Sequence, residues 1–237
     1  MAEPKRIRKR IAALLLPLLA LVLAGAGLLS VIRAQDGPAE TEGRQRPLRK
    51  GLVVFVVDAS ASMRIRDVPG DGGTTRTRLE AAVQEIEKTL DGLLEDAEFT
   101  FDIVLCSSRV GILSEALAEA GPLRLTPRTR EEASRFLREV PRAGMSRLLS
   151  ALDTALRICR RGGSRRRPAS VCLYSDGIPT FDRRSPGPRT IDGFLETVEA
   201  SNRSGERINA FAVSATSEGL EFLARLCREN RGLLFTL

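Results

Sequence analysis

Residues 53–57 form an unbroken apolar run, Val-Val-Phe-Val-Val, that ends at Asp58. Four of these five residues are β-branched, and no polar residue alternates with them. Such a run predicts a strand that is buried on both faces, as in a parallel α/β sheet. Similar runs predict four more strands, over residues 99–106, 169–174, 208–213 and 233–237.

Helical periodicity appears between these runs. Residues 77–94 carry apolar side chains three or four positions apart, at Leu79, Val83, Ile86, Leu90 and Leu94. Further helices are predicted over residues 131–140, 146–159, 190–200 and 218–227. Two weaker apolar runs, 110–113 and 123–125, compete for one additional strand. The alternation predicts an α/β fold, a doubly wound and mostly parallel six-stranded sheet flanked by helices.

The segment before the predicted sheet has the pattern of a membrane anchor. Residues 1–10 are basic, and residues 11–32 carry no charge. A helix over residues 11–32 would be about 33 Å long, enough to cross a hydrocarbon core of about 30 Å. The basic cluster should remain cytoplasmic, so residues after Arg33 should lie outside the cytoplasm. Residues 33–50 are polar, contain Gly and Pro, and are typical of a linker, leaving residues 51–237 as the domain.

A cleaved signal peptide is the alternative for this segment. Its apolar region would end near Leu23, with Ala24-Gly25-Ala26 as the cleavage site. Residues 27–32 extend the apolar run past that site and favour an uncleaved single-pass anchor. Both interpretations export the domain, either to the outer side of the membrane or as a secreted protein.

Composition removes several classes of function. The chain contains no histidine, which excludes Ser-His-Asp and Cys-His catalysis and any His-ligated zinc. Its four cysteines, Cys106, Cys159, Cys172 and Cys227, form no C-x-x-C pair, and the sequence leaves open whether any two form a disulfide. The formal net charge is +7, and all but four of the 37 basic residues are arginine. No recognition helix or interleaving of aromatic and basic residues supports nucleic-acid binding.

Oxygen-bearing side chains follow two of the predicted strands and precede one predicted helix. Asp58, Ser60 and Ser62 follow the first strand, Asp176 follows the strand over residues 169–174, and Ser146 opens a helix. Ligands of open α/β sheets bind at the carboxyl ends of the strands, so these side chains should meet at one edge. Carboxylates and hydroxyls are hard ligands that suit Mg²⁺.

These motifs resemble the von Willebrand factor type A domain and its metal-ion-dependent adhesion site. The family carries Asp-x-Ser-x-Ser after its first strand, a Thr before a helix, and Asp-Gly after its fourth strand. The resemblance covers about residues 51–237 and implies metal ligation by Asp58, Ser60, Ser62, Ser146 and Asp176. Ser146 stands where the family usually has Thr and lacks the methyl group that restricts χ1. Met145 replaces the second Gly of the family's motif.

The resemblance implies a membrane-anchored binding module, not an enzyme, that holds Mg²⁺, with Mn²⁺ or Ca²⁺ as alternatives. The metal would bind an Asp or Glu of a protein partner. Loops over residues 64–76 and 181–189 would surround the site, and Arg183, Arg184 and Arg189 would favour an acidic partner.

Two alternatives remain open from the residues. One is an Mg²⁺-dependent phosphoryl-transfer enzyme with Asp58 as its nucleophile and Asp176 as a metal ligand. The corresponding motif of haloacid dehalogenase-like phosphatases is Asp-x-Asp, however, and this chain has Ser60 in place of the second acid. The other alternative is a structural module with an empty metal site. A dinucleotide site is disfavoured because no Gly-x-Gly-x-x-Gly follows the first strand.

Overall fold

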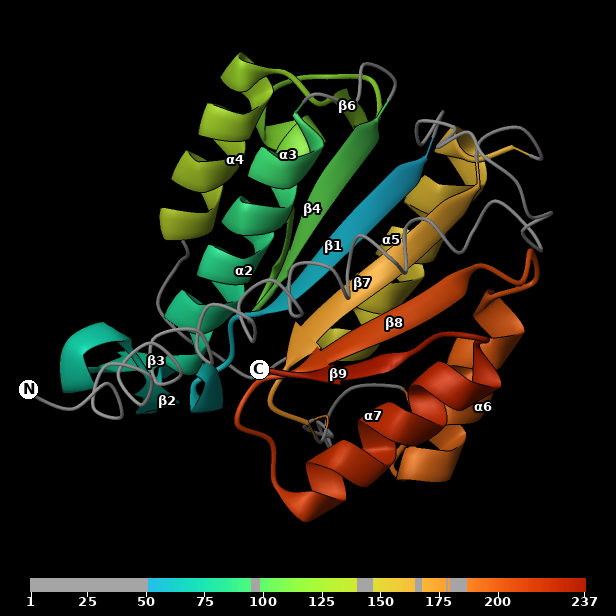
Figure 1. Ribbon diagram of the computed structural model, residues 1–237. Helices are drawn as coiled ribbons and strands as arrows, with labels where there is room; N and C mark the ends of the chain where they lie inside the picture. Colours follow the sequence, from blue (N-terminus) through green and yellow to red (C-terminus); the bar gives the residue numbers. More distant parts are fainter. Residues whose placement is uncertain (1–50, 95–98, 140–146, 165–167, 178, 180–186) are drawn as a thin grey trace, which may run out of the picture. The chain divides into compact units, whose positions relative to one another are not determined.

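The computed structural model describes residues 51–94, 99–139, 147–164, 168–177, 179 and 187–237 (Figure 1). The chain divides into two units, Met1–Leu48 and Arg49–Leu237, and every described residue belongs to the second. The predicted basic segment 1–10, anchor 11–32 and linker 33–50 therefore lie outside the described residues. Within the described part of the chain, no helix is long and apolar enough to cross a membrane.

A mostly parallel sheet forms the centre of the described unit (Figure 1). Its strand order is β5-β4-β1-β7-β8-β9, and β6 also pairs with β4. β4, β1, β7, β8 and β9 are parallel, whereas β5 and β6 run antiparallel to β4. The strands are β1 (Leu52–Asp58), β4 (Thr100–Cys106), β5 (Val110–Ile112), β6 (Leu123–Arg124), β7 (Ala169–Ser175), β8 (Arg207–Ala212) and β9 (Leu234–Thr236).

The prediction of six strands is wrong for the described residues, which form a seven-stranded sheet. Both weak apolar runs after β4 become strands, although only one was expected. The reason is the exposed edge of β4. β5 pairs with Val104–Cys106 near its end, and β6 pairs with Thr100 and Phe101 near its beginning. Two short segments thus share an edge that would otherwise expose unpaired backbone groups.

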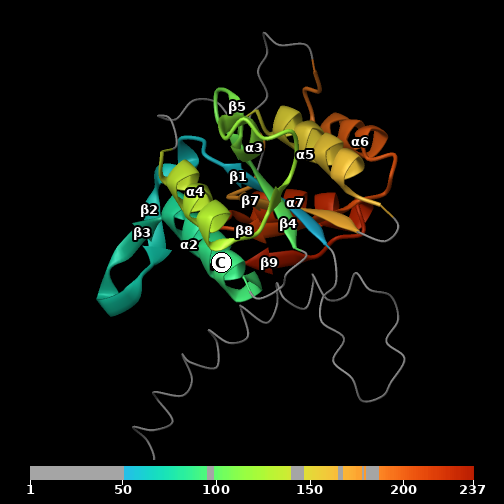
Figure 2. The same cartoon turned by 90° about the horizontal axis from the view of Figure 1, so that it is seen from above.

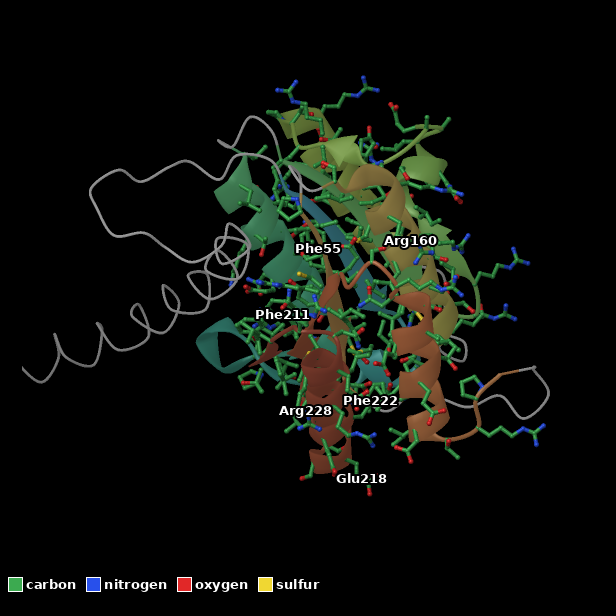
Figure 3. The ribbon with its side chains drawn as sticks, turned by 90° about the vertical axis from the view of Figure 1, so that its right-hand side faces the viewer. Phe55, Arg160, Phe211, Glu218, Phe222 and Arg228 are labelled. Atoms are coloured by element: carbon green, nitrogen blue, oxygen red, sulfur yellow. The ribbon has the colours of Figure 1, made fainter. Side chains whose placement is uncertain are left out.

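Helices cover both faces of the sheet. Figure 2 shows α2 and α4 on one side and α5 and α6 on the other. Leu52, Val54 and Val56 of β1 join the apolar core formed with α5, α6 and α7. Phe222 of α7 (Figure 3) meets Phe194 of α6 edge-on, with ring centroids 5.4 Å apart. The helices are α2 (Arg78–Leu93), α3 (Leu113–Ala116), α4 (Pro127–Arg138), α5 (Leu148–Gly162), α6 (Ile191–Ser201) and α7 (Ser217–Glu229).

Two helix boundaries differ from the predicted ones by more than two residues. α4 begins at Pro127, earlier than expected, because the Thr126 side chain caps the Thr129 N–H and Pro127 is favourable in a first helical turn. α5 continues past the predicted end to Gly162, and the Gly163 N–H bonds to the Cys159 carbonyl.

The predicted loop over residues 64–76 contains ordered secondary structure. After the short 3₁₀ helix η2 (Ser62–Arg64), β2 (Arg66–Pro69) and β3 (Thr75–Thr77) form an antiparallel hairpin. The Arg66 guanidinium donates to the Thr75 carbonyl at 2.6 Å. Gly72 lies in the turn with φ 65°, a conformation that glycine adopts at little cost. The hairpin leads directly into α2.

All four cysteines are buried free thiols in this structure. Burial raises the pKa of Cys172 and of Cys227 to about 12, so both thiols are protonated at neutral pH. A protonated, enclosed thiol acts as a small apolar side chain.

Asp102 is the fully buried carboxyl group of β4. Its Oδ2 accepts a hydrogen bond from the Ser114 hydroxyl at 2.6 Å, and its Oδ1 accepts from the backbone N–H groups of Ile103 and Ser114. Burial raises its pKa above 3.8, although the bonds from Ser114 and Ile103 lower it. A carboxyl with a raised pKa in the folded state contributes stability below its unfolded pKa and loses it as pH rises through the folded pKa.

We therefore expect the difference in unfolding free energy between the wild type and Asp102→Asn to depend on pH. Asparagine cannot ionise, so the wild type should lose stability relative to the variant as pH rises from 3.8 through the raised pKa. Urea unfolding followed by circular dichroism across this range measures the difference. A difference that is independent of pH, or that moves in the opposite direction, would contradict the prediction.

Candidate metal centre

Asp58 lies at the carboxyl end of β1, beside the end of β7. The parallel register pairs Val57 with Tyr174, which brings Asp58 level with Ser175. Asp58 is only 5% exposed, and both of its carboxylate oxygens accept hydrogen bonds. The Ser60 N–H donates to Oδ1 at 2.9 Å, and the Ser175 hydroxyl donates to Oδ2 at 3.0 Å. The strand end thus holds the carboxylate in a fixed orientation.

Burial and a neighbouring carboxylate both disfavour the ionised form of Asp58. Burial raises the pKa of Asp58, and the hydrogen bonds from Ser60 and Ser175 lower it. The negative charge of Asp176 raises that pKa as well, since the two carboxylates lie close enough to repel each other. A cation between them would relieve this repulsion.

The hydroxyl groups of Ser60 and Ser62 lie side by side after β1. Their Oγ atoms lie 3.1 Å apart and share a hydrogen bond. Mg²⁺ binds oxygen at about 2.1 Å in an octahedron, which places adjacent ligand oxygens about 3.0 Å apart. Ser60 is 8% exposed, and Ser62 begins η2, so the backbone turn after β1 directs both hydroxyls. This donor pair fits the coordination that the sequence predicts.

Asp176 follows β7, at the same edge of the sheet, and bonds to an arginine. The Arg78 Nη1 donates to its Oδ2 at 2.7 Å. The structure therefore brings Asp58, Ser60, Ser62 and Asp176 to one edge. Ser146, the fifth predicted ligand, lies outside the described residues.

The family comparison can now be set beside this geometry. The sequence profile of the von Willebrand factor type A domain matches residues 53–178, more than half of the chain. The chain belongs to the von Willebrand factor type A (vWA) family. The match spans the segments that carry all five predicted ligands. No curated protein sequence matches the chain significantly.

Solved structures share the vWA fold at low sequence identity. A von Willebrand factor type A protein from Catenulispora acidiphila is 18% identical, with a TM-score of 0.58, over 80% of this chain and 39% of that chain. The pilus adhesin SpaC of Lactobacillus rhamnosus GG is 12% identical, with a TM-score of 0.61, over 83% and 29%. The PilB minor pilin of Streptococcus sanguinis is 15% identical, with a TM-score of 0.58, over 84% and 59%.

The vWA family consists in general of non-enzymatic adhesion and interaction modules. This membership agrees with the expected class of function. The phosphoryl-transfer alternative gains no support from the site. In the described part of the chain, no three Asp, Glu, Cys or His side chains cluster as a metal site.

Sequence reasoning gave no role to two side chains around this vWA site, Arg78 and Ser175. Arg78, the first residue of α2, bonds to Asp176 and also to Asp67 of the hairpin. Ser175 supports Asp58. Ser175 adjoins the recognised Asp-Gly motif, and its position opposite Asp58 could have been found from strand register. Arg78 offered no such signal among so many arginines.

A close glycine contact fixes the turn that carries Asp176. Gly177 has φ 131°, and a Cβ built on it would lie 2.4 Å from the Cα of Gly219 in α7. The Gly177 N–H also bonds to the Ser175 hydroxyl at 3.2 Å. The first turn of α7 therefore packs directly against the Asp176–Gly177 peptide.

Of the two predicted partner-facing loops, the first is the β2–β3 hairpin. Arg183 and Arg184 of the second lie outside the described residues, whereas Arg189 is described and exposed.

Proposed function

We propose that this vWA chain is an interaction module that holds Mg²⁺ and uses it to bind an acidic residue of a protein partner. Asp58, Ser60, Ser62, Ser146 and Asp176 would hold the metal, and Mn²⁺ or Ca²⁺ could replace Mg²⁺. The observation that carries the proposal is that Asp58, the hydroxyl groups of Ser60 and Ser62, and Asp176 come together at the carboxyl edge of the sheet. Carboxylate and hydroxyl oxygens are the hard ligands that Mg²⁺ prefers.

The residues around the site explain why a partner's carboxylate would be the natural ligand. Bound Mg²⁺ would supply a hard Lewis-acidic centre with a coordination position open to solvent. The hydroxyls of Ser60 and Ser62 are neutral donors, so the described set contributes only the charges of Asp58 and Asp176. With Mg²⁺ this set is formally neutral, so a partner's carboxylate would bind as a hard oxygen ligand at the open coordination position and not through a net positive charge. The arginine at position 189 adds to this preference for an acidic partner.

The structural neighbours named as a pilus adhesin and a minor pilin agree with a role in contact between proteins. Their low identity means that this agreement concerns the fold, and the partner of the present chain is identified only by its carboxylate chemistry.

The proposal includes a membrane location. Residues 11–32 would span the membrane once, with residues 1–10 in the cytoplasm and the vWA domain outside. Extraction of cell membranes with alkaline carbonate tests this location, because an anchored chain stays in the pellet. Recovery of a protein shortened at Ala26 from the medium would support cleavage and secretion instead.

Heating the protein with and without divalent metal tests the site. Because the chain has no Trp and one Tyr, unfolding is best followed by circular dichroism. Mg²⁺ or Mn²⁺ at about 100 times its dissociation constant should stabilise the fold by about 2.7 kcal/mol. For a domain of this size, that corresponds to a rise in Tm of roughly 5 to 10 °C over the value in EDTA.

Asp58→Ala should abolish this rise, because it removes a ligand at the centre of the site. Asp91→Ala is the matched control. Asp91 lies in the last turn of α2, at the opposite end of the helix from Arg78. Its side chain is half exposed and pairs with Arg130 of α4. The control variant should keep the full metal-dependent rise. A wild type whose Tm is the same in EDTA and in saturating metal would refute the metal site.

A further inference from the structure

Arg78 forms ion pairs with two carboxylates that come from different parts of the chain. Its Nη1 donates to Asp176 Oδ2 at 2.7 Å. Its Nε donates to both oxygens of Asp67, at 3.0 and 3.1 Å, and its Nη2 donates to Asp67 Oδ2. The Ser214 hydroxyl, after β8, donates to the same Oδ2 at 3.0 Å. One guanidinium therefore joins the hairpin to the predicted metal ligand that follows β7.

The start of α2 is built to hold Arg78 in this place. Thr77 caps the helix in a capping box with Glu80, and the Arg78 N–H bonds to the Ile65 carbonyl at 3.1 Å. Side chains in a first helical turn lean toward the helix N-terminus, which here points at the edge of the sheet. The Arg78 side chain is only 13% exposed, and that of Asp176 only 11%. The pair is therefore largely shielded from solvent, where screening by salt is weak.

This guanidinium supplies the positive charge that a metal would otherwise supply. Asp58 and Asp176 repel each other, and Arg78 pairs directly with the Asp176 carboxylate. A metal bound to Asp176 would lie close to the guanidinium and be repelled by it. An oxygen that accepts a charged hydrogen bond is also a poorer donor to a metal. Arg78 and a divalent ion thus compete for the same carboxylate.

We propose that Arg78 is a positioning residue that holds Asp176 in the metal-free protein and releases it when metal binds. The inference rests on the proposed metal site. Asp67 retains the guanidinium after release, since three of the four Arg78 donor contacts already go to that carboxylate. Metal occupancy is thereby coupled to the position of the β2–β3 hairpin, which borders the surface that a partner would meet.

Arg78→Gln provides the direct test, with Mn²⁺ binding to the full chain in detergent measured by electron paramagnetic resonance of the free ion. The variant should bind Mn²⁺ about tenfold more tightly than the wild type, the size expected when one adjacent like charge is removed. In EDTA, its Tm should be lower than that of the wild type, because two carboxylates lose their partner. If Arg78 had a purely structural role, the variant would have a lower Tm but an unchanged affinity for Mn²⁺.

Two further variants separate competition from general charge effects. Asp67→Asn should weaken Mn²⁺ binding, because Arg78 then has only Asp176 as a charged partner. Arg66→Gln removes an arginine from the same hairpin, where it pairs with Glu80, and should leave Mn²⁺ affinity within about twofold of wild type. Should Arg78→Gln fail to fold, Arg78→Lys keeps the charge without the fork and should give a smaller gain.

The outcomes distinguish this inference from the metal site itself. Tighter binding by the Arg78 variant than by a wild type that itself binds Mn²⁺ supports the inference, whereas a wild type that binds no Mn²⁺ overturns the release of Asp176 by metal even if the variant binds it. Equal or weaker binding overturns it, while an Asp58-dependent rise in Tm in the wild type would still uphold the metal site. Absence of Mn²⁺ binding in both the wild type and the Arg78 variant overturns both.

Discussion

Gly177→Ala should lower the free energy of unfolding by about 3 kcal/mol, since it combines a strained backbone with an impossible contact. The φ of Gly177 is 131°, which side-chain-bearing residues rarely adopt, and the new Cβ would lie 2.4 Å from the Gly219 Cα. The atoms nearest to this Cβ all belong to the backbone of Gly219, so no flexible side chain can move aside. Either α7 or the Asp176 turn must shift, and Mn²⁺ affinity should fall together with stability. Urea unfolding and Mn²⁺ titration measure the two effects.

Two other glycines divide the expected loss into its causes. Gly72 has φ 65° with no atom within 4 Å of its built Cβ, so Gly72→Ala should show backbone strain alone, about 1 kcal/mol. Gly92 lies inside α2 in open space, and Gly92→Ala should be neutral or stabilising by up to about 1 kcal/mol. If Gly177→Ala costs no more than Gly72→Ala, the proposed close packing of α7 against the Asp176 turn is wrong.

The sequence predicts the centre of the sheet well because burial on both faces leaves a direct trace. Val53–Val57 is an unbroken apolar run and residues 169–174 are apolar apart from Ser170, and the two segments become the adjacent strands β1 and β7. The edge strands are harder to predict. β5 and β6 have two or three residues each, and their pairing depends on the length of β4 and not on any pattern of their own.

The β2–β3 hairpin is a second part of the fold that the sequence pattern does not predict. Residues 66–77 contain Gly, Asp and Arg and read as a solvated loop, yet β2 and β3 pair there, and Arg78 next to them bonds to Asp67. Contacts between side chain and backbone, such as that from Arg66 to Thr75, add to the backbone pairing. Such contacts are not encoded in hydrophobic periodicity.

The candidate site divides in the same way. Asp58, Ser60 and Ser62 are adjacent in sequence, so a short motif reveals them, and strand order places Asp176 beside them. The ion pair between Arg78 and Asp176 joins residues 98 positions apart. One arginine among many gives no sequence signal for such a contact. The placement of the four described candidate ligands thus follows from a motif and strand order, whereas the contact of Arg78 with Asp176 requires coordinates.

Ser175→Ala should cost about 2 kcal/mol of unfolding free energy and weaken Mn²⁺ binding. Ser175 is fully buried; its hydroxyl donates to Asp58 Oδ2 at 3.0 Å and accepts from the Gly177 N–H at 3.2 Å. Alanine would leave a carboxylate oxygen and a buried N–H without this partner, and unsatisfied buried groups cost about 1 to 3 kcal/mol each. Asp58 would also lose a support for its orientation.

Ser170→Ala is the matched control on the same strand. Ser170 is 1% exposed, and its hydroxyl has no hydrogen-bond partner among the described residues. Its removal should therefore be neutral or stabilising and leave Mn²⁺ affinity unchanged, because a buried hydroxyl without a partner costs free energy. Urea unfolding of the two variants in EDTA compares a bonded and an unbonded buried serine of β7. If both lose the same stability, the link from Ser175 to Asp58 contributes nothing beyond packing, and the carboxylate must be held in place by the Ser60 N–H alone.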